Sequence, residues 1–118
     1  MWPKSWIEGK ADVLHALEDW RGAHAQAWGY SVSHSQFLLR LYRQTDSAPL
    51  GSLYLYLKIC DRVAFLSLWR DAHIRIEERK GEYGPVFVVS DGDRLRIECG
   101  AVFAASSTEL VSFESPSI

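Results

Sequence analysis

Asparagine is absent from all 118 residues of this chain. N-linked glycosylation requires an asparagine side chain, and so does a Cys-His-Asn catalytic triad, so both are excluded. The sequence also lacks the glycine-rich phosphate loops, the nucleophile elbow, the paired histidines of metalloproteases and the EF-hand calcium loop. We therefore assign no catalytic residue and no cofactor, and we expect a protein that is not an enzyme.

Cysteine is scarce, with only Cys60 and Cys99 present and no CxxC pair. Thioredoxin-like redox chemistry and zinc ribbons both need closely spaced cysteine pairs, so neither is supported. A secreted disulfide scaffold of this size would carry more cysteines. The sequence predicts two reduced, partly buried thiols in a cytoplasmic protein, and a single Cys60–Cys99 bridge stays open as the alternative.

Long apolar segments are also missing, because charges interrupt every stretch long enough to span a bilayer. The first residues include Lys4, Glu8 and Asp12 and lack the apolar run of a signal peptide. The formal charge is −2, from 13 basic and 15 acidic residues, so no overall field attracts nucleic acid. We expect a cytoplasmic protein with no membrane contact, and nucleic acid is a disfavoured partner.

The composition favours one folded domain over residues 1–118. Hydrophobic residues make up 47% of the chain and charged residues 24%, which is typical of globular domains rather than of disordered segments. A chain of this length buries about two thirds of its unfolded surface. A stable core therefore needs no disulfide and no metal.

A helix is predicted over residues 6–29. Residues 5–8 match a capping box, and Gly29 has the position of a C-terminal cap. Gly9 and Gly22 are unfavourable inside a helix, so any break is expected near one of them. The side chains that recur at helical spacing are Val13, Leu17, Trp20, His24 and Ala27.

From residue 36 to residue 105 the apolar period changes to two, which predicts strands. Residues 52–60 alternate most clearly, with leucines on one face and tyrosines on the other. Residues 63–69 are apolar on both faces, so we expect them to form a central strand. The remaining predicted elements are strands at residues 37–44, 73–78, 85–90 and 94–99, an extension of the last strand to residues 101–105 past a kink or bulge at Gly100, a loop at 45–51 and a mobile tail at 106–118.

The links between these strands are short, and short links require antiparallel neighbours. The predicted fold is therefore α+β, with one N-terminal helix packed on an antiparallel meander of about six strands. Because several strands are apolar on both faces, the sheet either stays open, curls around the helix or closes partly into a barrel.

Alternation along the strands collects tyrosines and basic residues on the face opposite the leucines. Tyrosine and arginine are enriched at binding surfaces because they combine a rigid contact area with a polar tip. The candidate binding residues are Arg40, Tyr42, Tyr54, Tyr56, Lys58, Arg75, Arg94 and Arg96. An alternative needs no partner, because Glu77 and Glu98 can pair with the arginines and the C-terminal tail can cover the tyrosines.

The leading functional hypothesis is a protein-binding module that uses this face, or an exposed edge strand, to bind another protein or a second copy of itself. It predicts that Arg94→Glu with Arg96→Glu abolishes partner capture and leaves thermal stability nearly unchanged. The first alternative is a small-molecule binder or simple enzyme whose pocket, between helix and curled sheet, is lined by His24 and Trp20. The second alternative is a binder of single-stranded nucleic acid.

One cluster has the spacing of metal ligands. Asp12, His15 and Asp19 lie three and four residues apart, on one face of the predicted helix. A metal would need at least one further ligand from elsewhere. We therefore interpret the cluster as a solvated polar face and assign no metal site.

Overall fold

The computed structural model describes residues 2–43 and 51–113. Most of this part of the chain is antiparallel sheet with one short helix, which confirms the predicted fold in outline. Within it, no helix has the length and hydropathy that a membrane crossing requires. The elements are β1 (Ile7–Glu8), α1 (Lys10–Glu18), β2 (Ala23–Ser31), β3 (Gln36–Tyr42), β4 (Ser52–Lys58), β5 (Arg62–Phe65), β6 (Leu68–Ala72), β7 (Arg75–Gly81), β8 (Gly84–Asp91), β9 (Leu95–Cys99) and β10 (Ala101–Ser107).

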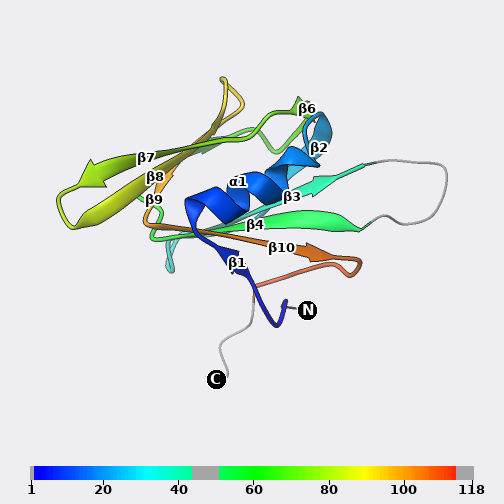
Figure 1. Ribbon diagram of the computed structural model, residues 1–118, viewed down its shortest axis with the longest axis horizontal. Helices are drawn as coiled ribbons and strands as arrows, with labels where there is room; N and C mark the ends of the chain where they lie inside the picture. The colour runs from blue at the N-terminus through cyan, green and yellow to red at the C-terminus, as the bar shows by residue number, and fades with distance from the viewer. Residues whose placement is uncertain (1, 44–50, 114–118) are drawn as a thin grey trace.

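The strands form two sheets instead of the single predicted meander (Figure 1). In the described residues, the six-stranded sheet has the order β1-β10-β4-β3-β2-β6 and the four-stranded sheet has the order β5-β9-β8-β7. Neither sheet closes on itself, so the sheets are open and form no barrel. The chain passes from β9 in one sheet to β10 in the other at Gly100, whose amide donates hydrogen bonds to the carbonyls of Lys58 and Ile59.

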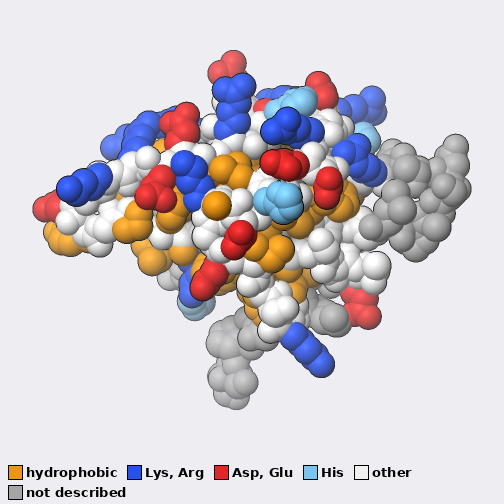
Figure 2. Space-filling view, in the orientation of Figure 1, with side chains coloured by type: hydrophobic (Ala, Val, Ile, Leu, Met, Phe, Trp, Pro, Cys, Tyr) orange, Lys and Arg blue, Asp and Glu red, His pale blue; other side chains and the backbone are white. Residues whose placement is uncertain are grey.

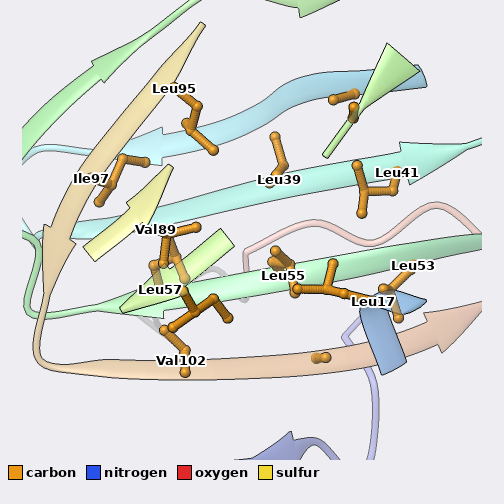
Figure 3. Close-up of a cluster of buried hydrophobic side chains, with 14 of the residues drawn as sticks. Leu17, Leu39, Leu41, Leu53, Leu55, Leu57, Val89, Leu95, Ile97 and Val102 are labelled. Carbon is orange, nitrogen blue, oxygen red and sulfur yellow. The ribbon is translucent and has the colours of Figure 1, made fainter. Parts of the chain in front are cut away.

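The main core lies between the two sheets (Figure 3). Leu39 and Leu41 of β3 and the three leucines of β4 reach it from the six-stranded sheet. Val89, Leu95 and Ile97 reach it from the four-stranded sheet. Helix α1 packs against β10 and β7 and adds Val13 and Leu17. The alternation predicted for β4 is therefore confirmed, because its leucines face this core.

The predicted helix over residues 6–29 is wrong outside Lys10–Glu18. Gly9 and Gly22 have φ of 93° and 81°, and these left-handed conformations flank the helical segment. The predicted capping box does not form, because residues 7 and 8 pair with β10 and no side chain caps the helix. After Gly22 the alanines of β2 alternate into the core, and pairing with β3 and β6 satisfies the backbone on both sides.

The predicted central strand at residues 63–69 is also wrong. Its two halves are separate edge strands, β5 in the four-stranded sheet and β6 in the six-stranded sheet. Phe65 packs on Phe37 with 4.9 Å between ring centroids, whereas Leu66 and Leu68 are exposed. The segment is apolar on both faces because its halves serve different sheets, not because it is covered on both sides.

The predicted mobile tail at residues 106–118 begins too early. Ser106 and Ser107 end strand β10, Val111 is buried, and Phe113 packs against the aromatic rings described below. Residues 114–118, residue 44 and residues 45–50 of the predicted 45–51 loop lie outside the described residues.

Candidate functional site

The eight predicted binding residues do not form one surface, because they belong to two sheets. The outer face of the six-stranded sheet carries those from β3 and β4, whereas the outer face of the four-stranded sheet carries those from β7 and β9. The first group is Arg40, Tyr42, Tyr54, Tyr56 and Lys58, the second is Arg75 and Arg96, and Arg94 lies in the turn between β8 and β9.

The outer face of the six-stranded sheet is aromatic and covered. Tyr54 and Tyr56 are only 0% and 9% exposed, and burial raises the pKa of the Tyr56 hydroxyl. The ring of Trp2 meets Tyr56 edge-on, with 4.8 Å between centroids. We call this surface the aromatic face: Trp28, Leu38, Tyr54, Tyr56 and Phe103, covered by Trp2, Trp6, Val111 and Phe113.

Hydrogen bonds hold the covering segment after β10 in place. The indole Nε1 of Trp28 donates to the Val111 carbonyl. The Val111 amide in turn donates to the Tyr54 hydroxyl, at 3.3 Å. Both tyrosines are thus beneath other parts of the chain, and neither offers a contact area for a partner.

Arg40 is committed to contacts within the aromatic face's sheet. Its Nε donates to Ser52 Oγ at 3.0 Å, and its guanidinium carbon lies 4.5 Å from the centre of the Tyr42 ring. His24, predicted to line a pocket, instead stacks on Tyr42 with 5.2 Å between centroids. The row His24, Tyr42 and Arg40 is therefore a packed side-chain ladder.

The outer face of the four-stranded sheet is different, because it carries charges that are only partly paired. Glu98 lies 3.7 Å from Arg62 and 3.7 Å from Arg79, so both of these arginines have an acidic neighbour. Within residues 2–43 and 51–113, Arg75 and Arg96 have no ion pair and no side-chain hydrogen bond.

Strand register places the two unpaired arginines in one row across the sheet. Arg75 is opposite Ser90, Ser90 is opposite Arg96, and Arg96 is opposite Ala64. Directly opposite residues share a face of the pleat, so these four side chains are on the same side. We call this row the arginine row. Figure 2 shows charged side chains of both signs over the part of the molecule that β7 occupies.

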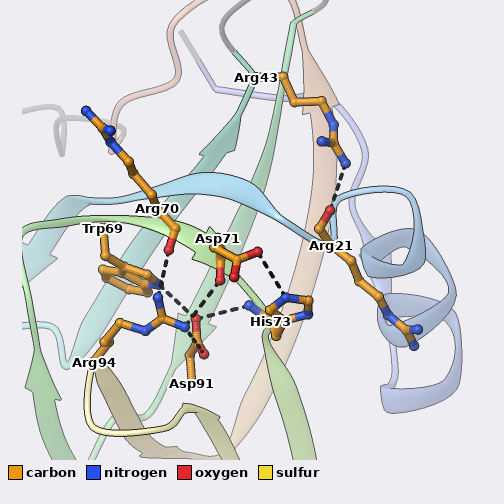
Figure 4. A network of polar contacts seen from close by, with 8 residues as sticks. All are labelled: Arg21, Arg43, Trp69, Arg70, Asp71, His73, Asp91 and Arg94. Atoms are coloured by element: carbon orange, nitrogen blue, oxygen red, sulfur yellow. Dashed lines mark hydrogen bonds and ion pairs between the residues drawn. The ribbon is translucent and has the colours of Figure 1, made fainter.

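A buried carboxylate anchors the end of this sheet to the other one (Figure 4). Asp91 accepts hydrogen bonds from Trp69 Nε1 at 2.8 Å, from the His73 amide at 3.1 Å and from Arg94 at 3.0 Å. Arg94 also donates to the carbonyls of Arg70 and Asp71. Arg94 is thus a structural residue, and the prediction that its reversal leaves stability unchanged conflicts with these contacts.

A cleft of about 380 Å³ does lie between α1 and the start of β7. Neither of the predicted pocket residues lines it. His24 is on the outer face of the six-stranded sheet, and Trp20 lines a separate hollow beside Ser52 and Ser106. The residues around the cleft are Leu14, Leu17, Glu18, Arg21, His73, Ile74 and Arg75.

Cys60 and Cys99 are both free, so the alternative of a disulfide is wrong. Burial raises the pKa of the Cys60 thiol to about 11 and that of Cys99 to about 12. Neither thiol forms a nucleophilic thiolate near neutral pH. In the described part of the chain no three metal-ligating side chains gather, and His15 of the predicted cluster lies 3.6 Å from Glu18.

Sequence reasoning missed the Asp91 anchor and the part of the cover that Trp2 and Trp6 supply, whereas the alternative that the C-terminal tail covers the tyrosines is confirmed by Val111 and Phe113. Asp91 precedes Gly92, so it has the signature of a turn residue, and nothing local indicates that Trp69 lies beside it. Trp6 and Trp28 were assigned to a helix that does not exist there. Comparisons with protein-family models, with curated proteins and with solved structures found no match for this chain.

Proposed function

We propose that this protein is a small cytoplasmic module that acts by binding, and that its arginine row receives an acidic segment of a partner protein. One observation carries the proposal: Arg75 and Arg96 flank Ser90 and have no acidic partner in the described residues. The chain as a whole is acidic, with a formal charge of −2. Attraction of an anionic segment is therefore local to this face.

The chemistry of the arginine row suits carboxylates. A guanidinium offers planar, two-pronged donation to a carboxylate and is more weakly hydrated than an ammonium group. Ser90 adds a hydroxyl between the two cations, and Ala64 leaves room beside Arg96. The Asp91 anchor at the end of β8 holds this part of the sheet rigid, which lowers the entropy cost of binding.

A protein segment suits this face better than nucleic acid. Binding of single strands uses exposed aromatic rings for base stacking, but the tyrosines expected to supply them are buried in the aromatic face. Glu77 also lies on the arginine row's side of the sheet and would repel a continuous polyanion. Separate carboxylates on an extended segment avoid that repulsion.

The test uses a fluorescently labelled peptide of alternating glutamate and alanine, whose carboxylates are separated along the chain, and measures its fluorescence anisotropy as the full-length protein is added at low salt. Arg75→Glu with Arg96→Glu should weaken binding by about tenfold or more, because both cations become repulsive. The matched control, Lys4→Glu with Arg70→Glu, makes the same charge change at exposed positions outside the four-stranded sheet. Equal loss in both variants, or no loss in the first, would contradict the proposal.

A second probe distinguishes binding of an acidic peptide from binding of nucleic acid. An oligothymidylate of similar charge should bind more weakly than the peptide, and its binding should not quench tyrosine fluorescence. Tighter oligothymidylate binding with quenching would instead favour the nucleic-acid alternative.

A further inference from the structure

Strand β5 has a free backbone edge. It is the outermost strand of the four-stranded sheet, and within the described part of the chain it pairs with β9 alone. The Leu66 amide donates to the Arg94 carbonyl of the β8–β9 turn at 2.8 Å, and antiparallel ladders alternate. The amides and carbonyls of Val63 and Phe65 therefore point away from β9. In the described residues no hydrogen bond occupies them.

The side chains around this edge are apolar and exposed. Phe65 is 38% exposed, Leu66 49% and Leu68 54%, and the Tyr30 ring lies 5.9 Å from Phe65. Edge strands of monomeric proteins are normally protected by charges, proline or a covering segment. From Val63 to Leu68 there is neither a charge nor a proline.

The opposite edge of the same sheet shows such protection. Strand β7 carries Glu77, Glu78, Arg79 and Lys80 in succession, all of them exposed. When an edge pairs with its own copy about a two-fold axis, the residue on the axis lies opposite itself. Any of these four on the axis opposes two like charges, which destabilises the pair. Self-pairing of β7 about an axis at any of these four residues is thus disfavoured.

We propose that β5 pairs with β5 of a second copy of this chain, antiparallel, with the two-fold axis at Ala64. In this register Val63 lies opposite Phe65 of the second copy, so their outward backbone groups form four hydrogen bonds across the axis. Ala64, small and exposed, opposes itself, and Arg62 opposes Leu66. No like charges meet, and the patch of Phe65, Leu66 and Leu68 flanks the junction.

This register has a consequence for the arginine row, although the dimer does not depend on any ligand of that row. Ala64 is the last member of the row, so the rows of the two copies become collinear across the axis. The two Arg96 residues are then three strand spacings apart, about 14 Å. That exceeds the screening length of about 8 Å at physiological salt, so they do not oppose association.

The test measures the molar mass of the full chain by light scattering and sedimentation over a range of concentrations. Wild-type protein should reach twice the 13.4 kDa of one chain. Ala64→Lys should raise the dissociation constant at least about tenfold, because two ammonium groups face each other. Glu78→Lys, the same side chain on the β7 edge, should leave the dissociation constant unchanged.

A mixing experiment tests the axis itself. Ala64→Lys and Ala64→Glu should each be monomeric alone and should form a heterodimer when mixed, because opposite charges then meet at position 64. Unfolding curves of each variant check that the fold persists, and Ala64 is exposed enough for that. A monomeric wild type at about 100 µM, equal effects of Ala64→Lys and Glu78→Lys, or no heterodimer on mixing would overturn the proposal.

Discussion

The outer faces of the two sheets have opposite characters. The aromatic face of the six-stranded sheet is covered by segments from before α1 and after β10, whereas the outer face of the four-stranded sheet carries arginines and glutamates with no segment over it in the described residues. An apolar face this large is unfavourable in water and needs a cover. A charged face is stable in water, so it needs no cover.

The comparison also shows why residue type alone is a poor guide to a binding surface. Tyrosine and arginine are enriched at interfaces, yet here Tyr54 is buried and Arg40 is packed on Tyr42. What distinguishes Arg75 and Arg96 is that, among residues 2–43 and 51–113, no side chain forms an ion pair or hydrogen bond with them. An unsatisfied contact is a stronger indication of function than an enriched residue type.

The largest expected loss of stability comes from a substitution in the covered aromatic face. Tyr54→Ala should lower the free energy of unfolding by about 3–5 kcal/mol, because it opens a cavity under the covering segment. Tyr54→Phe should lower the free energy of unfolding by about 1 kcal/mol, because it removes the hydroxyl that accepts a hydrogen bond from the Val111 amide. Urea unfolding measures both values.

Tyr83 supplies the matched control for this pair of variants. It lies at the tip of the β7–β8 hairpin and is 96% exposed, so Tyr83→Ala should change stability by less than about 0.5 kcal/mol. A Tyr54→Ala cost as small as that of Tyr83→Ala would show that the aromatic face is not a packed layer.

The next largest effect on stability distinguishes Arg94 from Arg96, which lies two residues further along the chain. Arg94→Ala should cost about 1.5–3 kcal/mol, because buried Asp91 loses its charged hydrogen-bond donor. Arg96→Ala should cost less than about 0.5 kcal/mol, since among the residues that the structure describes its side chain has no partner to lose. Thermal unfolding of both variants tests the contrast, and equal costs would contradict the distinction between anchor and row.

The smallest expected effect concerns the two cysteine thiols at the core between the sheets. Raised pKa values of about 11 for Cys60 and about 12 for Cys99 mean that, at pH 8, both thiols should react with Ellman's reagent far more slowly than a free cysteine. The native protein holds these protons more tightly than the unfolded chain. Stability should therefore be unaffected by these groups below about pH 9 and fall as the pH rises toward 11 and 12.

Cys60 is the more accessible of the two thiols, so its reaction should come first. Cys60→Ser should remove that phase and leave the slower one. Rapid reaction of both thiols at pH 8 would show that water enters the core between the sheets.

Much of the β region was predictable because alternation is a local property. The leucine face of β4, the tyrosine face behind it and the turn at Asp91-Gly92 all follow from neighbouring residues. The error at residues 23–31 has a physical cause: His24 and Ala27 fit a helical stripe, and Ala23, Ala25 and Ala27 equally fit a strand. Pairing with β3 and β6 decides between them.

The candidate site was predictable only in part. Arg75 and Arg96 could be placed on a strand face, since alternation defines it, and the arginine row contains both. Two contacts could not be derived from local pattern. They are the hydrogen bond from Arg94 to Asp91 and the hydrogen bond from the Trp28 indole to Val111, 83 residues away in the sequence.

The sequence by itself determined that the chain forms mostly antiparallel strands, which face of β4 is apolar, and which catalytic motifs are lacking. Backbone geometry and side-chain periodicity act over a few residues, so these properties can be predicted from the order of neighbouring residues. The tertiary structure decided which sheet each strand joins, which apolar face is covered, and which arginines stay unpaired. Those outcomes depend on contacts between segments that are distant in the sequence, because the same segment can pack on more than one apolar surface.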